Sequence, residues 1–307
     1  MIQVSEAENV VVSVVIPSYN EQEHIGECLH SVLNQQTELA YDVVVVDSST
    51  DATPQIIAQE FPSVKLIHCG QRASPAQARN LGIQQARAPV VAFIDADCTA
   101  DPFWIEAITG AHQNSYPAIG GSISLATPWT WAGAILFVIE FSEYLPPSSA
   151  REIRWLPSCN LSVKRDALEK HGGFPTHMEA SEDMLFSRHL MAQSGSPLWF
   201  DPQIKIAHMN CHTLGDLQQR LRKLGYWSGR SRGSGIIPGG FLLQNSLLIP
   251  LLVPYRLAVI FARLVVRSGH KRLFALCLLC WPLMVYGLIC WARAFWRGVR
   301  EAREQAP

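Results

Sequence analysis

The segment Ala88-Pro89-Val90-Val91-Ala92-Phe93-Ile94-Asp95-Ala96-Asp97 decides how this chain is expected to fold. Its apolar run, residues 88–94, has the length and the β-branched composition of a buried strand. Two carboxylates one residue apart, Asp95 and Asp97, therefore enter the loop beyond the strand. Carboxylate oxygens suit Mg²⁺ or Mn²⁺, and a cation held by one or two of them keeps positions free for substrate phosphates. Aspartate is also a common turn former and helix cap, so the pair alone does not settle its role.

Upstream of this segment, the chain repeats a pattern of short apolar strand and helix. Strands are expected over residues 10–17, 42–47 and 64–68, and helices over residues 24–34, 54–60 and 75–86. Apolar strands that alternate with helices predict an α/β fold with a mostly parallel sheet flanked by helices. Ligands of such sheets bind beyond the carboxyl ends of the strands. The loops at residues 17–21, 47–53 and 95–97 are thus expected to meet in one crevice.

A second portion extends from about Asp101 to Arg232. Helices are expected over residues 104–112 and 164–171, strands over residues 119–125 and 155–163, and residues 131–141 are strongly apolar. A further helix is expected to start at Ser181. It carries Glu182 and Asp183 in its first turn, where the helix dipole favours negative charge.

Composition limits the classes of partner. With 307 residues, of which 48% are hydrophobic, the chain buries a large core without needing a metal or disulfides. A net charge of −1 argues against a nucleic-acid partner. The eight cysteines lack the spacing of a secreted domain, which favours a reducing compartment. Cys277 and Cys280 have the spacing of a redox or zinc pair, but their apolar surroundings indicate packing.

The C-terminal portion has a different character. Residues 273–292 carry no formal charge and are flanked by Lys271 and Arg272 on one side and Arg293 on the other. This length and these flanks predict a transmembrane helix. Residues 233–262 are interrupted by prolines and are expected to form an interfacial or re-entrant segment. The alternative is a buried helical hairpin of a soluble protein.

Five motifs in a fixed order resemble glycosyltransferase family 2. They are VVIPSYNE at residues 14–21, VDSSTD at 46–51, ARNLG at 78–82, FIDAD at 93–97 and SED at 181–183. The resemblance covers residues 10–232, and the ordered set is far more specific than any single motif. It implies a GT-A fold, inverting transfer from a nucleotide-diphosphate sugar, and Mg²⁺ or Mn²⁺ as cofactor. The spacing alone predicts only a crevice for phosphate and metal.

The resemblance also implies roles for individual residues. Nucleotide-sugar contacts are implied for Pro17, Tyr19, Glu21, Asp47, Arg79 and Asp95, metal ligation for Asp95, Asp97 and His208, and base catalysis for Asp183. Plainer alternatives stay open for several of them. Residues 17–21 also read as a helix entry capped by Asn20, Asp47 as a turn cap, and Arg79 as a surface arginine. His208 is equally a packed histidine beside a strand, and with His212 it has the spacing of a weakly supported zinc pair.

Asp183 is the expected base because inversion requires a carboxylate on the acceptor side of the crevice. A base works best when burial or a nearby like charge lifts its pKa toward neutrality. Glu182 is placed to supply part of that lift. The plain alternative is that the two acids only stabilise the helix dipole.

The expected reaction is transfer of a single sugar to an acceptor hydroxyl, with a lipid-linked acceptor at the membrane. Processive synthases of the family carry Gln-x-x-Arg-Trp, and residues 219–223 lack that tryptophan. The expected domains are a GT-A domain at 1–232 and a membrane-associated region at 233–307, at the cell membrane with the catalytic domain on the cytoplasmic side.

A basic cluster lies between these two expected domains, at Arg220, Arg222, Lys223, Arg230 and Arg232. It is expected to hold the donor diphosphate, a lipid phosphate or anionic headgroups, or else to be a solvated helix face. The alternatives to a transferase are a membrane-anchored nucleotidyltransferase and a non-catalytic nucleotide-sugar-binding protein. A nucleotidyltransferase should carry a glycine-rich basic loop after the first strand, which residues 18–21 do not form.

Overall fold

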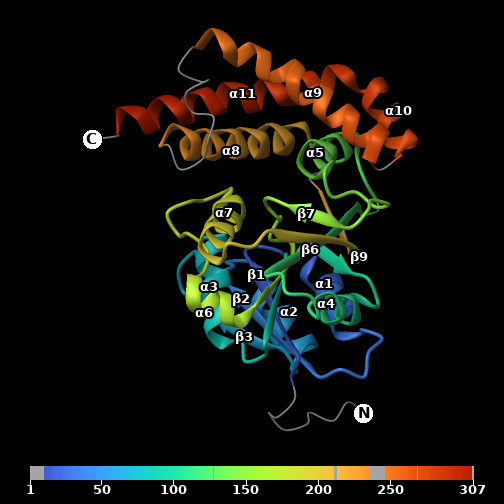
Figure 1. The fold of residues 1–307 in the computed structure, drawn as a ribbon. Coiled ribbons are helices and arrows are strands. Elements are labelled where there is room, and N and C mark those ends of the chain that lie inside the picture. The colour runs from blue at the N-terminus through green and yellow to red at the C-terminus, as the bar shows by residue number, and fades with distance from the viewer. Residues whose placement is uncertain (1–9, 127, 211–212, 235–245, 268, 306–307) are drawn as a thin grey trace. The chain divides into compact units, whose positions relative to one another are not determined.

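The computed structural model describes residues 10–126, 128–210, 213–234, 246–267 and 269–305 (Figure 1). Its contacts divide the chain into two compact units, and each is described by itself. The first unit comprises Met1–Ser124, Ala150–His177 and Glu182–His208, and the second comprises Leu125–Ser149, Met178–Ser181 and Met209–Pro307. The functional boundary expected at residue 232 stays a prediction.

The sheet has nine strands among the described residues, in the order β3-β2-β1-β4-β8-β6-β9-β5, with β7 paired to β9. The strands are β1 (Val12–Ser18), β2 (Tyr41–Asp47), β3 (Lys65–His68), β4 (Val90–Ile94), β5 (Cys98–Ala100), β6 (Ala118–Leu125), β7 (Arg151–Ile153), β8 (Asn160–Lys164) and β9 (Leu198–His208). The helices of the first unit are α1 (Ile25–Leu33), α2 (Thr53–Glu60), α3 (Pro75–Gln85), α4 (Trp104–Ala111), α6 (Arg165–His171) and α7 (Glu182–Ser194).

The first half of the sheet is parallel, as predicted. Strand β1 pairs in parallel with both β2 and β4, and β2 pairs in parallel with β3. Helix α3 lies very close to β1, since a Cβ atom at Gly82 would be 2.2 Å from Val15 Cγ1. The N-terminus of α3 is fixed by a capping box between Ser74 and Gln77. These two constraints hold α3, and with it Arg79, against the sheet.

The second half of the sheet is antiparallel, so the prediction of a mostly parallel sheet was wrong in its extent. Strand β8 is antiparallel to β4 and β6, and β9 is antiparallel to β5 and β7. The strand expected over residues 155–163 is the shorter β8. Strands β5 and β7 have only three residues each, and β9 contains Pro202, which lowers its strand signal. The sheet is therefore mixed.

A single buried amide joins the antiparallel strands to a helix. Asn160 Nδ2 donates hydrogen bonds to the carbonyl oxygens of Ser122 and Ile204, both at 3.0 Å, and its Oδ1 accepts one from Trp104 Nε1 at 3.0 Å. These partners lie on β6, β9 and α4. Gly121 makes room for this arrangement, because a Cβ atom there would be 1.9 Å from Ile204 O.

The second unit is helical. It contains α5 (Trp131–Phe141), α8 (Leu214–Gly233), η2 (Ser246–Leu251), α9 (Leu252–Ala262), η3 (Arg263–Arg267), α10 (Lys271–Leu279) and α11 (Trp281–Glu304). Helices α8 and α11 lie side by side (Figure 1). Their backbones touch, since a Cβ atom at Gly229 would be 2.1 Å from Phe295 O, and one at Gly298 would be 2.1 Å from Tyr226 O.

The transmembrane helix predicted over residues 273–292 is not one helix. It breaks at Cys280, and α10 and α11 meet there at a bend of 82°. Pro282, in the first turn of α11, cannot donate the hydrogen bond that a continuous helix needs. In the part of the chain that the structure describes, no single helix is both long and apolar enough to cross a membrane, although this bent pair passes that test together. Of the predicted interfacial segment, residues 235–245 lie outside the described part.

Candidate active site

The loops after β1 and β2 are bonded to each other. Asn20 N donates to Ser49 Oγ at 2.7 Å, Thr50 N donates to Asn20 Oδ1 at 2.9 Å, and Glu21 N donates to Thr53 Oγ1 at 3.0 Å. Asn20 has φ of 56°, in the left-handed region that asparagine tolerates better than most residues. Its side chain thus bridges two loops, where the sequence suggested only a helix cap. The two loops form one wall of the candidate site.

Asp47 has the geometry of the plainer alternative, a turn cap. It is fully buried, and its carboxylate accepts hydrogen bonds from the backbone N–H and the hydroxyl of Ser49. His68 Nδ1 lies 2.7 Å from Asp47 Oδ2. His68 was not among the predicted site residues, although parallel pairing places it opposite Asp47 in register. The nucleotide contact expected of Asp47 stays a prediction.

Tyr19 and Pro17 lie at the end of β1. The guanidinium of Arg72 stacks 4.6 Å from the centroid of the Tyr19 ring, a cation–π contact that the sequence did not suggest. Tyr19 is 37% exposed, so part of its side chain faces solvent. Pro17 is opposite Val46 in the β1–β2 pairing. The two residues are thus presented beside the loop that follows β2.

Arg79 joins two of the predicted acids. Its Nη2 donates to Asp95 Oδ1 at 2.6 Å and its Nη1 donates to Glu182 Oε1 at 2.8 Å. Burial alone would lower the pKa of Arg79, but Asp95 and Glu182 outweigh that effect and raise it. Arg79 is only 2% exposed, so the alternative of a surface arginine is wrong. The ion pairs connect α3, the loop after β4 and the first turn of α7.

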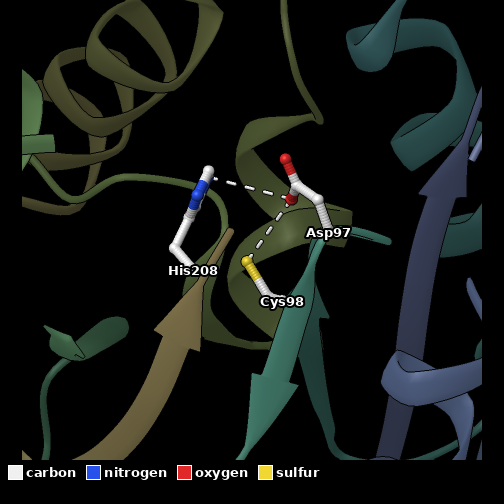
Figure 2. A group of neighbouring side chains, drawn as sticks. All are labelled: Asp97, Cys98 and His208. Carbon is white, nitrogen blue, oxygen red and sulfur yellow. Dashed lines mark hydrogen bonds and ion pairs between the residues drawn. The ribbon is translucent and has the colours of Figure 1, made fainter. Parts of the chain in front are cut away.

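Asp97, Cys98 and His208 form a group that could hold a cation (Figure 2). His208 Nε2 lies 3.8 Å from Asp97 Oδ1, and Cys98 Sγ donates to the same oxygen at 3.5 Å. The three ligand atoms all lie within 4.8 Å of one another. Asp95 faces Arg79 instead. Thus the structure brings Asp97 and His208 together and places Asp95 in an ion pair.

The pairing of β5 with β9 explains this group, because Cys98 stands opposite His208 in its register. The sequence did not suggest Cys98, although it directly follows Asp97. A carboxylate suits Mg²⁺ and Mn²⁺, whereas imidazole and thiol suit softer transition metals. This donor set therefore fits a divalent transition metal better than Mg²⁺. His212, the partner in the alternative zinc pair, lies outside the described residues.

Glu21 shares the negative region of the two aspartates. Burial and, to a smaller extent, the nearby charges of Asp97 and Asp95 together raise the pKa of the Glu21 carboxyl to about 8. A carboxyl with such a pKa is mostly protonated at neutral pH. A divalent cation near Asp97 would favour its ionised form.

The surroundings of Asp183 raise the pKa of its carboxyl. Its pKa is raised to about 7, first by burial and then by the charge of Glu182. The backbone N–H of Met184, which donates to Asp183 Oδ1 at 2.7 Å, and the charge of Arg79 partly offset this rise. Because Glu182 is engaged by Arg79, the two adjacent acids are not equivalent. Arg79 donates a hydrogen bond to Glu182 and not to Asp183.

Curated relatives of this chain are glycosyltransferases. The glycosyltransferase AglE of Haloferax volcanii is 29% identical over 219 residues, which cover 69% of this chain and 70% of that protein. The glucosyl-dolichyl phosphate glucuronosyltransferase of the same organism is 27% identical over 216 residues, which cover 64% of this chain and 68% of that protein.

Solved structures show the same fold. The mannosyltransferase PcManGT from Pyrobaculum calidifontis, in complex with GDP-Man and Mn²⁺, matches with a TM-score of 0.62 and 21% identity, over 94% of this chain and 88% of that one. S. aureus TarS 1-349, in complex with UDP-GlcNAc, matches with a TM-score of 0.54 and 16% identity, over 96% and 92% of the two chains. The mixed sheet with flanking helices matches the GT-A fold that the motifs implied.

The family model for glycosyl transferase family 2 matches residues 13–171, which are more than half of the chain. The match includes the motifs that end in Glu21, Asp51, Gly82 and Asp97. It favours a transferase over the alternatives of a nucleotidyltransferase and a non-catalytic binding protein. The protein belongs to glycosyl transferase family 2 and is a glycosyltransferase.

Proposed function

We propose that this enzyme is a metal-dependent inverting glycosyltransferase that moves one sugar from a nucleotide-diphosphate sugar to an acceptor hydroxyl. The observation that carries this proposal is the buried pair of ion pairs through Arg79, which ties Asp95 to Glu182. It holds the aspartate motif and the start of α7 in one rigid arrangement. Asp183, whose pKa is raised to about 7, belongs to that arrangement.

The donor is proposed to bind at the loops after β1 and β2. Tyr19, stacked by Arg72, and Pro17 would contact the base, and Asp47 would support the loop that receives it. Asp95 and Arg79 would contact the ribose and the diphosphate. The PcManGT structure is a complex with GDP-Man and the TarS structure is a complex with UDP-GlcNAc, which supports a nucleotide sugar here.

Asp97 and His208 are proposed to hold the cation, with Asp95 and Glu21 close to it. A bound Mg²⁺ or Mn²⁺ would neutralise charge on the departing nucleoside diphosphate. Mn²⁺ is present in the PcManGT structure, and the imidazole of His208 also favours it over Mg²⁺. The thiol of Cys98, which bonds Asp97, would orient that carboxylate.

Asp183 is proposed to accept the proton of the acceptor hydroxyl. As the proton leaves, the acceptor oxygen bonds the anomeric carbon, and the bond from that carbon to the diphosphate breaks with its electron pair on the diphosphate. Attack from the opposite face inverts the anomeric configuration. A base with a pKa near the working pH is suited to this step.

The acceptor is proposed to be lipid-linked, at the cytoplasmic side of the cell membrane. One relative's name describes action on a glucosyl-dolichyl phosphate. In the second unit, large apolar side chains are exposed at Leu278, Leu279, Trp281, Tyr286 and Ile289. They belong to the bent α10–α11 pair, and they support a membrane-associated region within residues 233–307, which would follow the catalytic domain proposed at 1–232.

The test uses the full chain in lipid nanodiscs with a panel of nucleotide sugars and Mn²⁺. Thermal stabilisation identifies the donor, because ligands of the native state raise its melting temperature. Proton NMR of the product with that donor should then show an inverted anomeric configuration. Retention of configuration would contradict the proposal, as would turnover that is unchanged after chelation of divalent cations.

A further inference from the structure

The second unit contains a group of arginines that the proposed chemistry does not use. Arg220 Nε lies 3.0 Å from Glu140 Oε1, and Arg263 Nη2 lies 2.6 Å from Glu143 Oε2. In each of these pairs, the carboxylate neutralises the charge of its arginine. Arg256, on α9, is different.

Arg256 stacks on an aromatic ring and has no acidic hydrogen-bond partner. The centre of its guanidinium lies 4.1 Å from the centroid of the Trp291 ring, on α11. In the described part of the chain, no carboxylate accepts a hydrogen bond from it. Burial and, to a smaller extent, the charges of Arg263 and Arg232 lower the pKa of Arg256 to about 10, and the charge of Glu140 offsets only part of this fall. A cation in such surroundings is costly unless an anion compensates it.

The geometry of the guanidinium indicates which anion fits. Stacking on Trp291 occupies one face of the group and leaves its in-plane N–H donors for another partner. Planar guanidinium donors match the oxygens of a phosphate group. Arg232, whose guanidinium centre lies 5.7 Å from the Phe295 ring centroid on the same helix α11, supplies a second charge of the same kind.

The chain around Arg256 is apolar and exposed. Tyr255 is 66% exposed, and on the adjoining element Val266 is 80% exposed. A small soluble anion would gain nothing from such neighbours, whereas a molecule with a phosphate and a hydrocarbon chain would use both features. Charge and apolar exposure together thus identify an amphipathic ligand.

We propose that Arg256, with Arg232, forms a binding site for the phosphate group of a lipid. The site rests on the proposed membrane function and sharpens it, since it assigns the headgroup chemistry that the second unit recognises. Two lipids share this chemistry, namely a polyprenyl phosphate of the acceptor type and an anionic phospholipid of the bilayer. The predicted basic cluster therefore contributes Arg232 to this site, while its centre lies at Arg256, outside that cluster.

The test measures binding of the full chain to vesicles by co-sedimentation. One set contains phosphatidylcholine with phosphatidylglycerol, and the other contains phosphatidylcholine with polyprenyl phosphate at equal surface charge. The variant is Arg256→Gln. The matched control is Arg300→Gln, which also removes an arginine on a tryptophan, 5.2 Å from the Trp296 centroid, with an ion pair to Glu304 at 3.5 Å.

Loss of a specific charged hydrogen bond should weaken binding by about 10-fold or more for Arg256→Gln. Loss of general attraction should weaken it by about fivefold at most for Arg300→Gln. If Arg256→Gln loses more binding than Arg300→Gln only on the polyprenyl phosphate vesicles, the ligand is the acceptor lipid. If it loses more binding on both sets of vesicles, the ligand is the headgroup of a bilayer phospholipid. The proposal is overturned if Arg256→Gln loses no more than Arg300→Gln.

Two controls keep the result interpretable. Arg256→Lys preserves the charge without the planar donors, so its binding should fall between that of wild type and Arg256→Gln. Donor binding and nucleoside-diphosphate release by the same preparations report on the first unit separately. A failed lipid site would leave them intact, and a failed transferase proposal would leave lipid binding intact.

Discussion

The two units of this protein concentrate opposite charges. In the first unit, Asp95 and Asp97 help to raise the pKa of Glu21 to about 8. In the second unit, Arg263 and Arg232 help to lower the pKa of Arg256 to about 10. In both cases burial is the first cause of the shift in pKa, and nearby like charges add to it. The comparison leads us to infer that each unit suits a partner of opposite charge, the proposed cation in the first and the proposed lipid phosphate in the second.

The largest expected effect is a loss of turnover in a variant that still binds lipid. Asp183→Asn should lower turnover by about 10³-fold, because it removes the proposed base, while donor affinity and vesicle binding stay unchanged. The measurement is steady-state kinetics beside donor titration and vesicle co-sedimentation. Turnover within tenfold of wild type would move the base to another residue.

Breaking the ion pairs of Arg79 should have the next largest effect. Arg79→Met leaves Asp95 and Glu182 without their buried partner, which should cost about 3–5 kcal/mol of unfolding free energy. Urea denaturation of the purified chain measures it. In the matched control, Arg165→Met removes an exposed pair with Glu169 at 2.8 Å and should cost less than about 1 kcal/mol. Equal losses in the two variants would show that burial adds nothing to the Arg79 pairs.

The stability of the second unit should depend on the small side-chain volume at the contact between α8 and α11. Gly229→Ala places a methyl group against the Phe295 carbonyl, 2.1 Å away before any shift, and overpacking of this kind costs about 1–3 kcal/mol. We expect weaker vesicle binding together with a lower melting temperature. Gly215→Ala, on the same helix with Thr213 Oγ1 at 3.6 Å as its nearest neighbour, should be neutral. If both variants melt like wild type, the helices are less tightly packed than described.

The smallest expected effect is on the number of protons that the protein binds. The folded pKa of Glu21, raised to about 8, exceeds its unfolded value of about 4.3. The metal-free folded protein thus binds more protons than the unfolded chain between these values, and its stability falls as pH rises through that window. Because a cation favours ionised Glu21, Mn²⁺ binding near pH 7 should release a fraction of a proton, and Mn²⁺ affinity should rise with pH.

Calorimetry in two buffers of different ionisation enthalpy measures this proton release. Glu21→Gln provides the control and should abolish most of it. Asp183, whose pKa is raised to about 7, titrates in the same window, so Asp183→Asn is the second control. Proton release that persists unchanged in Glu21→Gln would assign it to another group.

Local sequence features were enough to predict the parallel half of the first unit. Strands β1, β2 and β4 are nearly continuous apolar runs, and β2 is followed by α2, which carries a proline in its first turn. The family resemblance assigned Arg79 and Asp95 to one site, and the structure joins them by an ion pair. The parallel strands were predictable because successive strands of such a sheet end at the same edge.

Long-range pairing could not be predicted in the same way. Cys98 meets His208 because β5 pairs with β9, and nothing local to either strand specifies that register. Cys98 was therefore missed, while His208 was named only through the family resemblance. His68 was missed for a related reason, since its bond to Asp47 depends on β3 lying beside β2. The break at Cys280 went unpredicted because the prediction rested on the length of the apolar run. An apolar run does not show whether the backbone hydrogen bonds of a helix continue through it.

Asn160 has a consequence for how the first unit opens. Its amide bonds Ser122, Ile204 and Trp104 at once, so neither partner strand nor the helix can detach without stranding a buried polar group. Local fluctuations that free one strand at a time are thereby suppressed. We expect β6, β8 and β9 to exchange their backbone amide hydrogens with solvent as one cooperative block, and His208 on β9 to keep its position for as long as that block stays closed.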